Sequence, residues 1–230
     1  LMSWFKKITL LVLAGLMFGV LAVAGAYLYV KDDLPSVATL KEVKLQTPMR
    51  VFSQDGQLIS QFGEKRRIPL KLEEMPELLI KAVLATEDSR FYEHPGIDII
   101  GMFRAATVVA LSGEARQGAS TITQQVAREF FLSREKRILR KVKEIFLAIR
   151  IEQQLSKDEI LELYLNKIEL GQRSFGVGAA AQVYFGKAIQ DLTLSEMAII
   201  AGLPQAPSVL NPVRSPSRAR TRRNIVLGRM

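Results

Sequence analysis

Two adjacent carboxylates, Glu87 and Asp88, interrupt an apolar run and precede the only histidine of the chain, His94. The apolar spacing favours a helix that starts near Pro76 and carries Glu87 at or near its C-terminal end. The negative end of the helix dipole disfavours carboxylate anions there, so we expect a raised pKa for both acids. Such an acid can serve as a general acid or base near neutral pH if water is excluded, and is otherwise a solvated helix-end residue.

A second polar group lies on a helix that the sequence predicts from Ser120, which is suited to cap it, to about Leu132. Thr121, Gln125 and Arg128 fall at i, i+4 and i+7, on a face separate from an apolar stripe. This face can form hydrogen bonds but carries little charge, which is typical of a groove for a polar ligand. The alternative is an ordinary exposed helix face.

A charged triplet, Arg140, Lys141 and Glu144, shares one arc of a helix expected from about Glu135 to Gln154. The opposite arc is apolar and consists of Ile138, Val142, Ile145, Phe146 and Ile149. The core therefore does not need the triplet. Without other motifs it is a solvated face, whose ion pairs contribute only about a few tenths of a kcal/mol.

Several other chemistries are excluded by composition and spacing. The chain has no cysteine, which excludes disulfides, thiolate metal sites and cysteine nucleophiles. His94 alone does not provide the ligand spacing of a zinc site. Gly176, Gly178 and Ala181 fit the letters of a dinucleotide-binding fingerprint, but no βαβ unit surrounds them, so close helix packing explains them better.

These residues are held beside a membrane by the N-terminal segment. Ile8 to Val30 contains no charge and is long enough to cross a bilayer as a helix. Lys6 and Lys7 precede it, so the positive-inside rule places residues 1–7 in the cytoplasm and the chain after Lys31 outside. A cleavable signal peptide is the alternative, but the apolar run continues past the small residues at which cleavage would occur.

The formal net charge of +9 would suggest nucleic acid in a cytosolic protein. An exported domain beside a bilayer meets lipid phosphates first, so we do not expect nucleic acid as a partner. Ile99 to Leu111 is apolar apart from Arg104 and is too short to span the bilayer. It is either a buried core helix or a segment at the membrane interface.

The remaining pattern predicts one hairpin and several helices. Met49 to Ser53 and Gln57 to Phe62 flank an Asp-Gly pair suited to a tight turn. Ser156 begins a capping box that opens another helix. Two more helices are expected near Gly178 to Phe185 and Leu194 to Leu203, before a basic, helical C-terminal run.

Four ordered motifs resemble the peptidoglycan glycosyltransferase domain of class A penicillin-binding proteins, over roughly residues 50–215. The first motif is Glu87, Asp88, Phe91, His94 and Gly96; the second is Gly118, Ser120, Thr121, Thr123, Gln124 and Gln125; the third is Arg140, Lys141 and Glu144; the fourth is Lys157, Ile160, Leu161, Glu162, Tyr164, Leu165 and Asn166. Departures from the family pattern are small: Ala119, Arg128 and Glu129 replace residues common in relatives.

This resemblance implies a mainly α, lysozyme-like glycosyltransferase domain with a small β-hairpin, behind one transmembrane helix. The implied divisions are a cytoplasmic N-terminus (1–7), an anchor (8–30), a linker with the hairpin (31–70), the glycosyltransferase domain (71–215) and the start of a linker to a transpeptidase domain (216–230). Ser133 to Lys136 matches one transpeptidase motif by letters, but its companion motifs are missing, so that match is accidental.

The resemblance also implies the reaction and the roles of the residues. Lipid II would be polymerised into β-1,4-linked glycan with inversion and release of polyprenyl pyrophosphate, on the outer side of the bacterial inner membrane. Glu87 and Glu144 would be catalytic, with Asp88, Phe91 and His94 in support. The substrate-binding set would be Gly118, Ser120, Thr121, Gln124, Gln125, Arg128, Arg140, Lys141 and Asn166.

Glu144 is also the implied position for a divalent metal, Mg²⁺ or Mn²⁺, although no cofactor is required by the resemblance. Two alternatives stay open. A lytic, glycan-cleaving enzyme of similar fold would need one acid and no cradle for pyrophosphate, and the Arg140, Lys141 and Glu144 face argues against it. A non-enzymatic tethered scaffold would bind lipid II without needing Glu87.

Overall fold

The computed structural model describes residues 2–40, 49–56, 58–62, 66–112, 120–132 and 137–230, and this part of the chain is mainly helical, as predicted. The α-helices are α1 (Met2–Val30), α2 (Glu77–Glu87), α3 (Ile99–Ser112), α4 (Ile122–Phe131), α5 (Arg137–Gln154), α6 (Lys157–Lys167), α7 (Val177–Phe185), α8 (Leu194–Gly202) and α9 (Pro216–Arg229). Short 3-10 helices are η1 (Lys31–Asp33), η2 (Val37–Leu40), η3 (Leu72–Glu74), η4 (Ile189–Asp191) and η5 (Leu203–Gln205).

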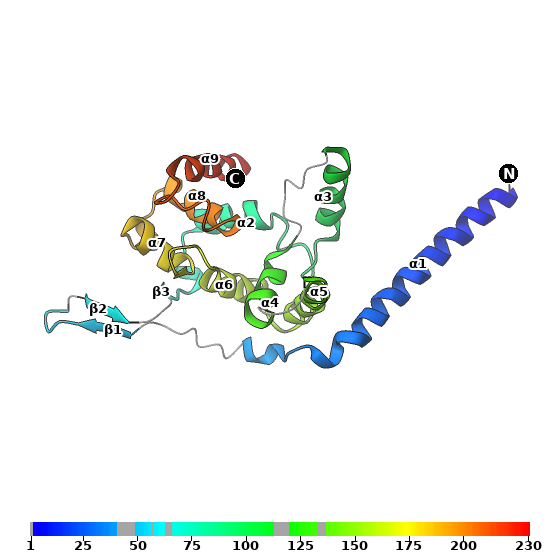
Figure 1. Cartoon of the computed structure of the whole chain (residues 1–230), viewed down its shortest axis with the longest axis horizontal. Coiled ribbons are helices and arrows are strands. Elements are labelled where there is room, and N and C mark those ends of the chain that lie inside the picture. The colour runs from blue at the N-terminus through cyan, green and yellow to red at the C-terminus, as the bar shows by residue number, and fades with distance from the viewer. Residues whose placement is uncertain (1, 41–48, 57, 63–65, 113–119, 133–136) are drawn as a thin grey trace.

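The strands lie at the margin of the helical body. β1 (Met49–Phe52) and β2 (Leu58–Phe62) pair antiparallel and form the predicted hairpin, which projects on the side opposite to α1 (Figure 1). Gly56 has a φ of +80°, as the turn requires. β3 (Arg66–Arg67) and β4 (Ser174–Phe175) make a short parallel pair that the sequence pattern did not predict.

Helix α4 is the centre of the body. It packs between α5 and α6, and its residues from Ile122 to Ala127 are all buried. A second group of helices, α2, α8 and α9, packs together and lies above α4, α5 and α6 in the view of Figure 1. The start of α4 differs from the prediction: Thr121, not Ser120, is the N-cap, because its hydroxyl accepts the backbone N–H of Gln124 at 3.2 Å.

Helix α1 exposes apolar side chains along its length, including Leu11 and Phe18. Within the described residues it is the one helix long and apolar enough to cross a membrane. Its length and composition are consistent with a membrane anchor. The chain then turns back and packs against α5, so that Val30, Val37 and Leu40 join the hydrophobic core. The predicted linker, residues 31–70, thus begins with a stretch that belongs to the core.

Helix α5 is packed on two faces, which the amphipathic pattern did not anticipate. The face toward α4 buries Glu144, Leu147 and Ile151. The predicted apolar arc makes other contacts: Ile138 is exposed, while Val142 and Phe146 are partly buried and pack against the core, with the Phe146 ring centroid 5.2 Å from that of Tyr27 in α1. Both faces of α5 therefore contribute apolar side chains to the core, and Glu144 is buried on the face that the pattern assigned to solvent.

Candidate active site

Glu87 is the last residue of α2; it is half-buried and lines the hollow described below. Its Oε2 accepts a hydrogen bond from Nε2 of Gln125 on α4 at 3.1 Å. Burial raises the pKa of Glu87, and the hydrogen bond from Gln125 lowers it in part. The raised pKa predicted for this residue is confirmed, but the main cause is the loss of solvent and not the helix dipole.

Gln125 also links Glu87 to α6. Its Oε1 lies 3.5 Å from the hydroxyl oxygen of Tyr164, which donates to it. Tyr164 is completely buried, and this burial raises its pKa well above the usual value, so the phenol keeps its proton. The chain of contacts from Tyr164 through Gln125 therefore fixes one orientation of the Glu87 carboxyl group.

Asp88 has a different environment from its neighbour. Its carboxylate lies 2.9 and 3.1 Å from Nε2 of His94, and its Oδ2 accepts the backbone N–H of Ile122 at 2.9 Å. Ile122 is the first residue of α4, so the helix N-terminus stabilises the anion. Asp88 and His94 thus tie the end of α2 to the start of α4, in the supporting position that the resemblance implies.

The loop between these acids and α3 is built around close contacts. Gly96 has a φ of +89°, and a Cβ there would lie 2.9 Å from the carbonyl oxygen of Ala148. The hydroxyl of Thr121 donates to the Gly96 carbonyl at 2.6 Å. Phe91 is buried, and the Lys157 ammonium lies 4.5 Å from its ring centroid. These motif residues hold the loop, and of them Thr121 also lines the hollow described next.

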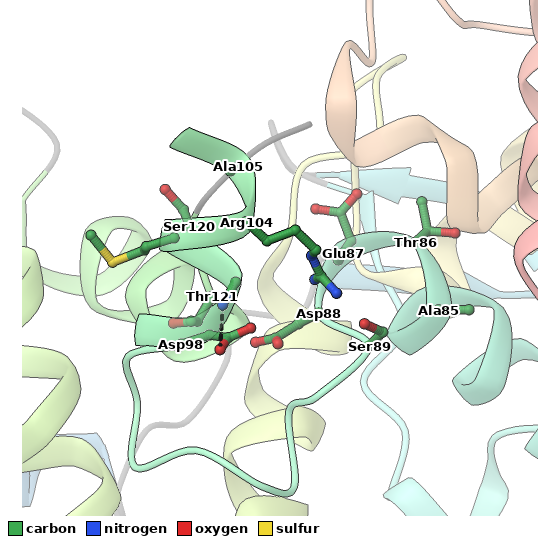
Figure 2. A pocket seen from close by; sticks show the side chains of 12 residues that line it. Ala85, Thr86, Glu87, Asp88, Ser89, Asp98, Arg104, Ala105, Ser120 and Thr121 are labelled. Carbon is green, nitrogen blue, oxygen red and sulfur yellow. Dashed lines mark hydrogen bonds between the residues drawn. The ribbon is translucent and has the colours of Figure 1, made fainter. Parts of the chain in front are cut away.

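A small hollow of about 40 Å³ opens beside the two acids. Its lining includes Glu87, Asp98, Arg104 and Ser120 from four separate segments. Figure 2 shows the Arg104 side chain of α3 reaching across this hollow toward Glu87 and Asp88. Sequence reasoning missed Arg104 and Asp98 as site residues, although Arg104 is the single charge in an apolar helix, which was a usable signal.

The charged triplet of α5 reaches the same hollow through Ser120. Nζ of Lys141 donates to Oγ of Ser120 at 2.8 Å and lies 3.1 Å from Oε2 of Glu144. Nε of Arg140 lies 3.5 Å from Oε1 of Glu144. The Glu144 side chain is only 3% exposed, so the solvated-face alternative is wrong for this residue. Glu144 therefore pairs with two cations, and one of them, Lys141, contacts the hollow through Ser120.

Several of the expected substrate-binding residues form hydrogen bonds within the protein. Gln124 completes the capping box of α4 through Oε1 and lies 3.5 Å from Nζ of Lys141. The amide of Asn166 donates to the Leu70 carbonyl at 2.7 Å and accepts the Leu70 N–H at 2.9 Å, so it fixes the chain before η3. Gly118 lies outside the described residues.

Arg128 and two further arginines surround Glu87. Nε of Arg128 is 3.5 Å from a Glu129 carboxylate oxygen, and Arg128 also lowers the pKa of Glu87. Arg222 and Arg229 of α9 have the same effect on Glu87. Sequence reasoning missed both of them, because they belong to a basic run whose docking face depends on tertiary packing.

The described residues offer little to a metal ion. Among them, no three His, Cys, Asp or Glu side chains gather as metal ligands. Glu144, the expected position for a metal, lies between Arg140 and Lys141 instead. The local chemistry suits an anionic ligand better than a divalent cation.

A family model and several curated proteins match this chain. The family model described as "Transglycosylase" matches residues 55–230. Penicillin-binding protein 1A of Vibrio cholerae serotype O1 is 67% identical over 229 residues, covering 100% of this chain and 28% of that protein. Penicillin-binding protein 1A of Escherichia coli K12 is 61% identical over 229 residues, covering 100% and 27%. The chain thus spans about a quarter of the length of these curated relatives.

A solved structure also matches. The 2.6 Å crystal structure of penicillin-binding protein 1A from Haemophilus influenzae has a TM-score of 0.46 and 41% sequence identity to this chain. It covers 82% of this chain and 18% of that one.

Proposed function

The chain belongs to the transglycosylase family, and from this premise we propose that it is a peptidoglycan glycosyltransferase that polymerises lipid II into β-1,4-linked glycan. The observation that carries the proposal is that Glu87 lines a hollow together with Ser120, and that Ser120 accepts a hydrogen bond from Lys141, which Glu144 pairs along with Arg140. A sugar polymerase that uses a pyrophosphate donor needs both parts.

Glu87 serves as the general base in this proposal. It takes the proton from the 4-hydroxyl of the acceptor sugar as that oxygen forms a bond to the anomeric carbon of the donor. The bond between the anomeric carbon and the phosphate oxygen breaks, and the pyrophosphate leaves with the electron pair. Attack from the face opposite to the leaving group inverts the linkage. Gln125 and Tyr164 keep the carboxyl group aimed at the acceptor.

The cations stabilise the charge that develops on the leaving pyrophosphate. Lys141, Arg140 and Arg104 supply charge from α5 and α3, and Arg128 supplies it from α4. Glu144 is the residue that positions Arg140 and Lys141, because its buried carboxylate contacts both. A lytic enzyme, which releases no pyrophosphate, would have no use for this cluster.

The N-terminal charges and an exposed apolar helix support a position of the protein relative to the membrane. We place α1 across the cytoplasmic membrane with the N-terminus inside and the helical body outside. Helix α3 exposes Ile100, Phe103 and Leu111, with Leu111 90% exposed. Such a surface suits the membrane interface, where the polyprenyl tail of the substrate stays in the lipid.

The direct test is to incubate the whole chain in detergent with labelled lipid II, with and without a metal chelator. We expect polymer and release of polyprenyl pyrophosphate, and we expect the chelator to leave the rate within about threefold because the cationic residues carry the charge stabilisation. Shortening of preformed glycan strands without polymer formation would favour the lytic alternative. Lipid II binding with neither reaction would favour the scaffold.

A further inference from the structure

Helix α9 carries two arginines on the face that packs against the protein. Ala219, Arg222, Val226 and Arg229 are spaced three, four and three residues apart and so share one face of the helix. Ala219 and Val226 are buried on this face, where α9 packs against α8 and α2 (Figure 1). Arg222 is half-buried there, and Arg229, the last residue of the helix, is exposed.

Each of these arginines caps the C-terminal end of another helix. Nη1 of Arg229 donates to the carbonyl oxygen of Thr86 at 3.2 Å, in the last turn of α2 and next to Glu87. Nε of Arg222 donates to the carbonyl oxygen of Gly202, the last residue of α8, at 3.4 Å. A Cβ at Gly202 would lie 2.8 Å from Cγ of Arg222, so the glycine permits this approach. Helix ends favour cations there.

The carboxyl group that feels both charges is Glu87. Burial raises its pKa most strongly, while the Gln125 hydrogen bond, Arg222, Arg229 and Arg128 lower it, in that order. The pKa of Arg222 is itself lowered by burial and by Arg229, and raised by Glu87. The influence is therefore mutual.

The other groups that face Glu87 are accounted for. Tyr164 of α6 is neutral, and Arg104 of α3 lines the hollow from the far side. Asp88 is held by His94 and the N-terminus of α4. Arg222 and Arg229 of α9 act on the charge of Glu87 without lining the hollow.

We propose that Arg222 and Arg229 are positioning residues for Glu87: Arg229 holds the C-terminal end of α2, Arg222 holds the C-terminal end of α8, which packs against α2, and their charges keep the Glu87 carboxyl group in its ionised, proton-accepting form. This proposal rests on the proposed function of Glu87 as a general base. It makes α9 part of the catalytic machinery, although neither arginine lines the hollow.

The test compares Arg222→Gln and Arg229→Gln with a matched control, Arg223→Gln. Glutamine removes the charge but keeps an N–H donor for the capped carbonyl. Arg223 is adjacent on α9 and contacts the Asn224 side chain at 2.9 Å. Initial rates on labelled lipid II are measured with the whole chain from about pH 6 to about pH 9, and thermal unfolding is followed at each pH.

Without the positive charge, Glu87 holds its proton to higher pH, so the acid limb of the profile moves upward. We expect each test variant to lose roughly three- to tenfold more activity at the acidic end than at the alkaline end. Arg223→Gln should follow the wild type, and Arg229→Lys, which keeps the charge, should retain most of the wild-type profile.

Profiles that run parallel to the wild type, merely lower, would mean that the two arginines only hold the fold, and would overturn the proposal. Loss of activity in Arg229→Lys equal to that in Arg229→Gln would overturn it as well. A wild-type chain that forms no polymer at any pH would contradict the proposed function instead, so the two failures are distinguishable.

Discussion

Glu87 and Asp88 are neighbours in the chain but occupy opposite electrostatic environments. Glu87 is buried beside Gln125, and the loss of solvent raises its pKa. Asp88 receives the first N–H of α4 and lies against His94. Environments that separate two acids in this way commonly separate their roles, one as the proton carrier and the other as a structural anion. At the scale of the residue, this pair is the centre of the site.

Replacing Glu87 with glutamine should abolish polymerisation while leaving the fold intact. Glutamine keeps the size and the contact with Gln125 but cannot accept a proton, so a loss of roughly 10²- to 10⁴-fold in rate is expected. The measurement is the initial rate on labelled lipid II. Glu93→Gln is the matched control, since its side chain is 66% exposed and pairs with Arg90 at the surface. Near-normal elongation by Glu87→Gln would remove the general-base role.

The same variant should change the pH dependence of stability. Burial raises the pKa of Glu87 in the folded chain above its ordinary value, so the folded chain binds the proton more tightly than the unfolded chain does. The wild type therefore loses stability as pH rises from the unfolded pKa through the raised folded pKa. Glu87→Gln should unfold at about the wild-type temperature in acid and at a higher temperature at neutral pH. A constant difference across this range would contradict the burial effect.

Glu144→Gln should lower the rate of polymerisation by roughly 10- to 100-fold, because Glu144 positions two cations that stabilise the leaving group. The neutral amide no longer holds Arg140 and Lys141 by charge, so the KM for lipid II should rise together with the fall in kcat. Steady-state kinetics separate the two effects, with Glu129→Gln as a control on an acid that is about one-third exposed and pairs with Arg128. An unchanged rate would reduce Glu144 to a packing residue.

Among the elements, α4 is the one on which the others converge. Its N-terminus binds Asp88, its second turn carries Arg128, and its two sides pack against α5 and α6. Thr121 completes this end by capping the helix and by donating to the Gly96 carbonyl at 2.6 Å. The orientation of the two acids therefore depends on how firmly α4 begins.

Thr121→Ala should destabilise the chain by about 1–2 kcal/mol through loss of the cap, and by further loss of the bond to Gly96. Ser120→Ala is the informative comparison, because Ser120 contacts Lys141 but does not cap the helix. It should leave stability nearly unchanged and affect activity alone. Thermal or denaturant unfolding of both variants decides between them, and equal destabilisation would contradict the assignment of the cap.

Sequence patterns predicted elements better than the faces on which they pack. The capping box at Ser156 and the Asp-Gly turn follow from local chemistry, and both are present. The cap of α4 was misassigned by one residue because Ser120 and Thr121 are both good N-caps. The apolar arc of α5 that includes Val142 and Phe146 does pack against the core, but the burial of the opposite face was missed because Glu144 enters it as an ion-paired acid.

At the scale of the whole molecule, the site is assembled from segments far apart in the chain. Glu87 comes from α2, its orienting amide from α4, the cationic pair from α5 and the capping arginines from α9. The resemblance to a family identified the first three. Arg222 and Arg229 could not be predicted, because no local pattern tells which face of a basic helix will dock onto α2.

The membrane-proximal stretch should contribute to the stability of the body. Leu40 is 3% exposed within the hydrophobic core, so Leu40→Ala should cost about 2–5 kcal/mol. Leu28→Ala removes the same atoms from a position on α1 that is 60% exposed, and should leave unfolding of the body unchanged. Unfolding in detergent, followed by far-ultraviolet circular dichroism, provides the comparison. Equal behaviour of the two variants would mean that Leu40 is not part of the core.

This docked stretch also determines how α1 is joined to the body. Nζ of Lys143 on α5 lies 3.4 Å from a carboxylate oxygen of Asp33, and Val30 is fully buried, so an ion pair and apolar packing hold this joint. If α1 crosses a bilayer as proposed, a tilt of this helix is transmitted to α5, which carries Arg140, Lys141 and Glu144.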